Sequence, residues 1–280
     1  MSIKVVTDST ADLPVDIVNE LDIKVVPLNV HFGEDVYRDG VELSAKEFMD
    51  RLVSGIDMPS TSQPSAGEFL NVYREISLLD HTVLSLHVSE ELSGTLNSAR
   101  QGAAELADED KIHIIDSRLV SMGLGLAVIS AARAAKSGKS LDEIIEIAKS
   151  VANRCRFFVM LDTLEYLERG GRIGKASALL GGLLRIKPIL TLNNGEVDSF
   201  GRARSRKSGI LKIEEAVSAL GPLERVAVIY NGAEEEAQEL ADRITGLHDL
   251  DDQPTLSELG PVISTHAGPN ALGVVVVCRE

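Results

Sequence analysis

The chain has 280 residues, enough for two ordinary domains, and its composition of 44% hydrophobic and 25% charged residues is that of a globular protein. The formal net charge of −15 argues against binding to the nucleic-acid backbone or to anionic membrane surfaces. Aromatic residues make up 4% and Trp is absent, so a large pocket would suit a flexible aliphatic ligand. No apolar stretch reaches membrane-spanning length and the N-terminus lacks a signal-peptide pattern, so we expect a cytoplasmic protein without stable membrane insertion.

The first half of the chain alternates short apolar runs with amphipathic ones. The apolar runs predict strands at Ile3–Thr7, Ile23–Val30, Thr82–His87 and Lys111–Asp116. The amphipathic runs predict helices at Pro14–Glu20, Ala45–Val53, Ala66–Ser77, Gly94–Leu106, Leu119–Lys136 and Leu141–Val151. Strands that alternate with helices favour a mostly parallel α/β sheet, in which ligands bind beyond the carboxyl ends of the strands.

The second half predicts an α+β arrangement with a mixed or antiparallel sheet. Predicted strands are Phe157–Leu161, Lys187–Leu192, Glu196–Phe200, Arg225–Tyr230 and Gly273–Cys278, the second and third forming a hairpin around Asn-Asn-Gly. Predicted helices lie near Ile210–Leu220 and Glu234–Ile244. We therefore expect an α/β protein with an N-terminal α/β domain at 1–155 and a C-terminal α+β domain at 156–280. Cys155 and Cys278 lie in apolar strand-like runs, and we expect both to be reduced thiols in the core.

Two hydroxyl-rich stretches, "PSTSQPSAGEF" and "SEELSGTLNSARQ", precede predicted helices. Their candidates for a small-anion site are Thr61, Ser62, Ser65, Ser93, Gly94 and Thr95. Free N–H groups at a helix start and neutral hydroxyls both bind anions. The competing interpretation is ordinary helix capping, which needs a single Ser or Thr at each start. Both interpretations stay open at this point.

The stretch "PVISTHAGPNALGVV" places His266 at the end of a predicted short strand, in a loop with Gly and Pro. An imidazole there could donate a hydrogen bond to a carboxylate in either charge state. A structural histidine is the alternative.

The stretch "VTDSTADLP" could bring Asp8, Ser9, Thr10 and Asp12 to the same sheet edge, with Asp12 expected to cap the first helix. The ligands needed for a metal site cannot be assembled from it.

Positive charge gathers in two segments of this acidic chain. "ERGGRIGK" supplies Arg169, Arg172 and Lys175, and "GRARSRK" supplies Arg202, Arg204, Arg206 and Lys207. Such clusters are usually solvated faces, although they could also form a patch for an acidic or phosphorylated partner. The chain has no P-loop, no complete dinucleotide fingerprint and no G-x-S-x-G elbow.

Eight stretches, in order along the chain, resemble the DegV family of bacterial fatty-acid-binding proteins. They are "VTDSTADLP", "VVPLNVHFG", "STSQPSAGEF", "ELSGTLNSA", "DSRLVSMGLG", "LDTLEYLERGGRI", "RIKPILTLNNGEV" and "HAGPNALG". The resemblance implies a two-domain α/β protein that buries one long-chain fatty acid between its domains. It implies that the carboxylate is held by Thr61, Ser62, Ser93 and His266, without a cofactor or metal. Asn270 stands where the family usually has Gly.

The resemblance also implies a partner. Some family members are the binding subunit of a fatty acid kinase and present the carboxylate to a separate ATP-binding subunit, which makes acyl-phosphate for phospholipid synthesis. Arg169, Arg172 and Arg202 would then dock the kinase. We expect a non-catalytic lipid carrier. The alternatives are a hydrolase of lipid esters or acyl-phosphates that uses Ser93 with His266 as base, and a docking module that works mainly through Arg202 and its neighbours.

Overall fold

The computed structural model describes residues 2–55, 58–179, 186–248, 250 and 252–279. A parallel sheet has the strand order β2-β1-β6-β7. Its strands are β1 (Ile3–Asp8), β2 (Lys24–Val26), β6 (Thr82–His87) and β7 (Ile112–Asp116). The parallel α/β arrangement predicted for the first half of the chain is confirmed.

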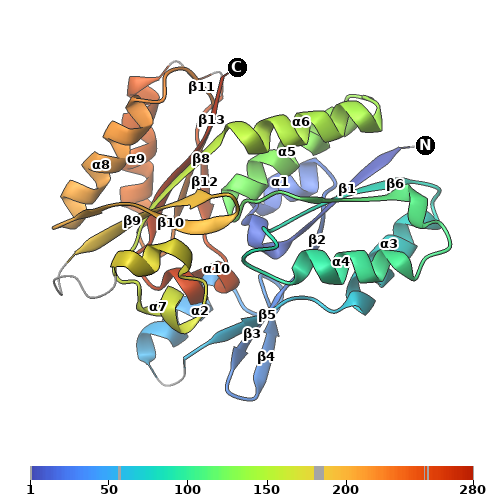
Figure 1. Cartoon of the computed structure of the whole chain (residues 1–280), viewed down its shortest axis with the longest axis horizontal. Helices are drawn as coiled ribbons and strands as arrows, with labels where there is room; N and C mark the ends of the chain where they lie inside the picture. The colour runs from blue at the N-terminus through green and yellow to red at the C-terminus, as the bar shows by residue number, and fades with distance from the viewer. Residues whose placement is uncertain (1, 56–57, 180–185, 249, 251, 280) are drawn as a thin grey trace.

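Helices pack on both sides of the parallel sheet (Figure 1). The helices of this half are α1 (Val15–Glu20), α3 (Ala66–Ser77), α4 (Thr95–Ala104), α5 (Met122–Lys136) and α6 (Leu141–Arg154), with the short 3₁₀ turns η1 (Ser9–Ala11) and η2 (Glu109–Lys111). Helices α3, α4 and α5 contact the sheet, and α6 packs mainly against α5. Helix α5 is almost entirely buried because it contacts both β1 of this sheet and strands of the second sheet. One hydrophobic core therefore runs through both halves of the chain.

The second sheet is mixed, with the order β10-β9-β8-β13-β11-β12. Its strands are β8 (Cys155–Met160), β9 (Lys187–Asn193), β10 (Glu196–Ala203), β11 (Leu223–Tyr230), β12 (Thr255–Glu258) and β13 (Leu272–Cys278). Helices α8 (Arg206–Ser218) and α9 (Glu234–Leu247) cover its outer face (Figure 1). The predicted hairpin is confirmed, since Asn194 and Gly195 both adopt positive φ (52° and 87°) between β9 and β10.

A small antiparallel sheet, β4-β3-β5, extends from the lower edge of the molecule in Figure 1. It consists of β3 (Asn29–Phe32), β4 (Asp35–Arg38) and β5 (Ser60–Ser62), and α2 (Ala45–Ser54) packs beside it. The expected single strand Ile23–Val30 is therefore wrong, because β2 and β3 belong to different sheets. Pro27 separates them, and proline cannot donate to a sheet ladder.

His266 lies on a helix, so its expected place at the end of a strand is also wrong. Helix α10 (Pro261–Ala267) begins with Pro at its first position and ends at Gly268, whose φ is +70°. It packs against α2, β3 and α7 (Glu165–Arg169), which precedes the 3₁₀ segment η3 (Gly174–Leu179). Both cysteines are free. Within the described residues, no helix has the length and apolarity that crossing a bilayer requires.

Candidate functional site

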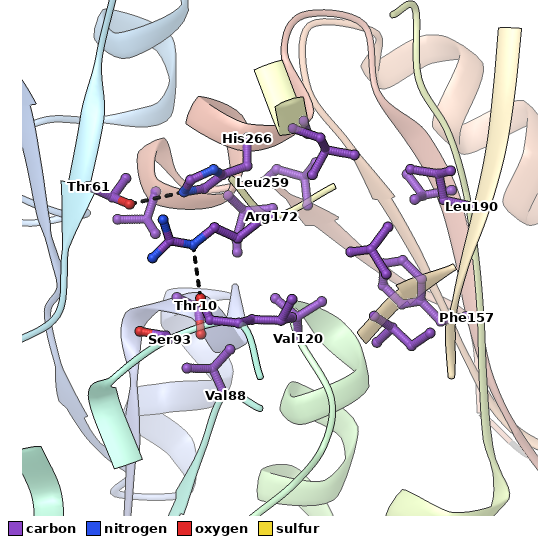
Figure 2. Close-up of a pocket in the computed structure, with 18 of the residues that line it drawn as sticks. Thr10, Thr61, Val88, Ser93, Val120, Phe157, Arg172, Leu190, Leu259 and His266 are labelled. Atoms are coloured by element: carbon purple, nitrogen blue, oxygen red, sulfur yellow. Dashed lines mark hydrogen bonds between the residues drawn. The ribbon is translucent and has the colours of Figure 1, made fainter. Parts of the chain in front are cut away.

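A cavity lies between the parallel sheet and the inner face of the mixed sheet. It is a hollow of about 900 Å³, measured out to its opening. Polar side chains gather at one end, around Thr61, Ser93, Arg172 and His266, whereas the opposite end is apolar around Phe157 (Figure 2). Such a cavity matches a long molecule with one polar end.

The apolar wall comes from the strand periodicity of the mixed sheet. Phe157, Val159 and Leu161 alternate along and beyond β8, so all three side chains face the cavity. The intervening Phe158 and Met160 face α8 and α9 instead. Further aliphatic lining comes from Leu190, Leu192, Val197 and Ile229.

The polar end joins segments about 200 residues apart in the chain. Thr61 on β5 and His266 on α10 form a hydrogen bond of 3.0 Å between Oγ1 and Nε2 (Figure 2). Ser62 lines the same end, and its Oγ is 2.9 Å from Nε2 of His31. Neither Thr61 nor Ser62 caps a helix, because α3 is capped by Ser65 in a capping box with Glu68.

The second hydroxyl stretch contributes less directly. Ser93 lines the cavity, and its Oγ is 2.9 Å from Oγ1 of Thr95. Thr95 is fully buried and, like Gly94, does not line the cavity. A side chain at position 94 would press on Gln63, so Gly94 gives Gln63 its place at the cavity wall.

His266 sits in a tight, poorly solvated position. Its Nδ1 is buried without a hydrogen-bond partner among the described residues, directly over Gly170, where a Cβ would collide with the ring. Burial, with a smaller contribution from the charge of Arg172, lowers the pKa of His266 to about 4. The imidazole is therefore neutral at pH 7. A proton on Nε2 leaves no unpaired N–H on Nδ1 and makes Nε2 the donor toward the cavity.

Arg172 reaches the cavity although sequence analysis assigned it only to docking. Its Nε donates to the carbonyl of Leu92 at 3.1 Å (Figure 2). Its Nη1 donates to the carbonyl of Gly170 at 2.7 Å. These two bonds hold a guanidinium close to His266 and Ser93. A ligand anion at this end of the cavity would face a positive charge, which offsets part of its desolvation.

Thr10 also lines the polar end, and a buried network fixes its orientation. Its backbone N–H (3.1 Å) and its hydroxyl both donate to Asp8 Oδ1. Asp8 Oδ2 is 2.9 Å from His87 Nδ1, His87 Nε2 is 2.7 Å from Ser85 Oγ, and that hydroxyl is 2.9 Å from the Tyr73 hydroxyl. Ser85, His87 and Asp8 have the order of a catalytic triad, but all three are 0% exposed. The sequence stretch suggested Thr10 only as one of several residues at a sheet edge.

Asp12 does not cap α1, contrary to expectation, since it adopts a left-handed conformation and the α1 cap position is Pro14. Instead, its carboxylate accepts from the Gly260 N–H at 3.0 Å and from the Ser121 hydroxyl at 2.6 Å. Asp39 accepts from the Val262 N–H at 3.4 Å. Two buried carboxyl groups of the N-terminal half therefore hold the start of α10, the helix that carries His266.

The other two candidate arginines lie outside the cavity. Arg169 is exposed on α7 and pairs with Glu165 at 2.6 Å. Arg202 is on β10 and lines a separate surface hollow with Arg204 and Lys212. Among the described residues, no group of three or more His, Cys, Asp or Glu side chains is placed to hold a metal ion.

Comparison with known proteins agrees with this architecture over the whole chain. The model of a family described as uncharacterised proteins of the DegV family matches residues 2–279. This chain belongs to the DegV family. A DegV domain-containing protein of Deinococcus radiodurans is 40% identical over 99% of this chain and 98% of its own length.

Two solved structures of fatty-acid-binding proteins superpose closely on this chain. The fatty-acid-binding DegV family protein of Thermus thermophilus aligns with a TM-score of 0.92 and 37% identity over 100% of both chains. A stearic-acid-binding protein of Eubacterium ventriosum aligns with a TM-score of 0.91 and 27% identity, covering 99% of this chain and 98% of the other. Structural neighbours of this DegV protein therefore bind fatty acids.

Proposed function

We propose that this DegV protein binds one long-chain fatty acid and presents its carboxylate to a separate ATP-binding kinase subunit. The observation that carries the proposal is the cavity itself, with an aliphatic wall and a single polar end at Thr61, Ser93, Arg172 and His266. The fatty-acid-binding neighbours support the same ligand class.

The binding free energies expected for the tail and for the carboxylate show that the two ends of the cavity play different parts in binding. Burying about 14 methylenes at 0.8 kcal/mol each gives a gross gain on the order of 11 kcal/mol. Each hydrogen bond to the carboxylate adds about 1.5–3 kcal/mol before the desolvation of the charge is subtracted. The tail would thus supply most of the affinity, and the polar end would orient the carboxylate.

The contacts around Ser93 and His266 favour binding over hydrolysis. A serine nucleophile needs a base within hydrogen-bond reach and a third group that orients the base. Ser93 Oγ is instead bonded to Thr95, and Nε2 of His266 is bonded to Thr61. No carboxylate among the described residues faces Nδ1 of His266.

We expect delipidated protein to take up one palmitate per chain and to leave acyl esters and acyl-phosphate intact. Native mass spectrometry after mixing measures the first, and product release over time measures the second. Absence of any fatty-acid adduct would overturn the proposal. Turnover that disappears in Ser93→Ala would replace it with the hydrolase.

The kinase step needs an accessible carboxylate and a docking surface. A carboxylate oxygen would attack the γ-phosphorus of ATP on the partner, forming acyl-phosphate as the bond to ADP breaks, and the product would enter phospholipid synthesis in the cytoplasm. The proposed docking residues are Arg172, which lines the polar end of the cavity, Arg202 in its own hollow, and Arg169, exposed on α7.

Charge reversal at Arg202 separates docking from binding. Arg202→Glu should keep palmitate binding unchanged, because Arg202 does not line the cavity, and should slow acyl-phosphate formation by a purified kinase subunit at least about tenfold. Arg38→Glu, on β4 of the small sheet, is the matched control and should leave both unchanged. Full kinase activity of Arg202→Glu would remove Arg202 from the docking surface.

A further inference from the structure

The apolar end of the cavity stops where a second hollow begins. Phe157, Thr191 and Leu192 line both the cavity and this second hollow, so they form the partition between them. Phe157 is the largest of the three side chains and is 7% exposed. It lies at the end of the cavity opposite Thr61 and His266 (Figure 2).

The second hollow differs in chemistry from the cavity. It measures about 1,380 Å³ out to its opening and lies between β7, α6 and the tip of the β9–β10 hairpin. Small or aliphatic side chains such as Leu119, Ala148 and Ala152 line part of it. Arg118, Lys149, Arg156 and Asn194 also line it. A hydrocarbon end that entered it would meet both these apolar side chains and polar or charged ones.

We propose that Phe157 sets the longest acyl chain that the cavity accepts. Its aromatic ring closes the cavity beyond the tail and separates it from the apolar side chains of the second hollow, such as Leu119 and Ala148. Shortening the side chain at this position joins the two hollows and lets additional methylenes be buried. This assignment rests on the proposed fatty-acid binding and names the residue that determines its length specificity.

The neighbouring residue offers a matched control. Phe158 is equally buried, at 5% exposed, but lies on the opposite face of β8 against Phe200. Removing either ring takes the same volume from the core. Of these two phenylalanines, Phe157 lines the cavity and Phe158 does not, so removal of Phe157 alone should change which fatty acid is bound.

The test is a competition among myristate, palmitate, stearate and arachidate. Delipidated wild type, Phe157→Ala, Phe157→Leu and Phe158→Ala are each mixed with an equimolar set of the four acids, and the bound acids are extracted and quantified. Each extra buried methylene favours binding by about fourfold. The ratio of bound stearate to bound palmitate should therefore rise about tenfold or more in Phe157→Ala, less in Phe157→Leu, and not at all in Phe158→Ala.

The outcomes separate this inference from the proposed function. If wild type binds the acids and both Phe157 variants keep its length profile, Phe157 does not set the length and the inference is overturned. An equal shift in Phe158→Ala would also overturn it, since loosening of the core would then be the cause. If no protein binds any acid, the proposed function itself has failed. Should Phe157→Ala not fold, Phe157→Leu decides by the same criterion.

Discussion

Replacing His266 by leucine is expected to weaken palmitate binding by about 10- to 150-fold. The change keeps a similar apolar volume but removes Nε2, which we infer to be the donor facing the carboxylate. A hydrogen bond to a charged group is worth about 1.5–3 kcal/mol, which corresponds to that range of dissociation constants. Isothermal titration or native mass spectrometry with delipidated protein measures it.

Two controls give this result its meaning. His266→Gln places a side-chain amide donor near the same point and should recover most of the affinity. Hexadecanol has the same tail, but its hydroxyl accepts only a neutral hydrogen bond, so His266→Leu should weaken its binding less than it weakens that of palmitate. Equal palmitate affinity of wild type and His266→Leu would show that the carboxylate lies elsewhere.

Replacing Asp12 by asparagine should make the protein more stable than wild type as the pH rises. Burial, reinforced by the charges of Asp39 and Asp8, raises the pKa of Asp12 from 3.8 to about 8. A carboxyl group with a raised folded-state pKa contributes stability that is complete below pH 3.8 and is lost as the pH rises through about 8. Asparagine still accepts from the Gly260 N–H and does not titrate.

The expected difference in the free energy of unfolding, variant minus wild type, therefore grows with pH. It should increase by up to about 1.4 kcal/mol per pH unit, or about 4 kcal/mol between pH 5 and pH 8. Urea denaturation at each pH measures the difference. Asp16→Asn changes an exposed carboxylate four residues away and should show no such trend. A pH-independent difference for Asp12→Asn would contradict the raised pKa.

The carboxyl groups with raised pKa values also hold the helix that carries His266. Asp12 and Asp39 bind the first turn of α10, and His266 lies in the last turn of that helix. Burial also raises the pKa of Asp39 to about 6, so Asp39 ionises at a lower pH than Asp12 does. The hydrogen bonds from the N–H groups of Gly260 and Val262 favour ionisation of these carboxyl groups, whereas burial opposes it, so ionisation costs folding stability without removing the bonds that hold the start of α10.

The sequence predicted the parallel sheet and the β9–β10 hairpin because local signals determine them. Apolar runs alternate with amphipathic ones in the first half, and Asn194-Gly195 favours the positive φ values of a tight turn. Helix α10 was missed because its β-branched segment "VIST" suggests a strand. The available counter-signal was Pro261 at the first position of the helix.

The candidate site was predictable in residue type but not in side-chain direction. Thr61, Ser62, Ser93 and His266 line one cavity, whereas Gly94 and Thr95, in the same motif as Ser93, do not. Neighbours in a turn point in different directions, and a motif does not say which of them faces the ligand. Arg172 and Thr10 were not assigned to the cavity because their positions depend on contacts with Leu92 and Asp8, which only the folded chain provides.

The most direct test of the site is the ¹³C NMR signal of carboxyl-labelled palmitate bound to delipidated protein. We expect one bound carboxyl resonance that saturates at one equivalent. It should shift in His266→Gln and in Thr61→Val but stay in place in Phe158→Ala. A bound resonance that none of these substitutions moves would place the carboxylate away from Thr61 and His266, and the absence of any bound resonance would contradict fatty-acid binding itself.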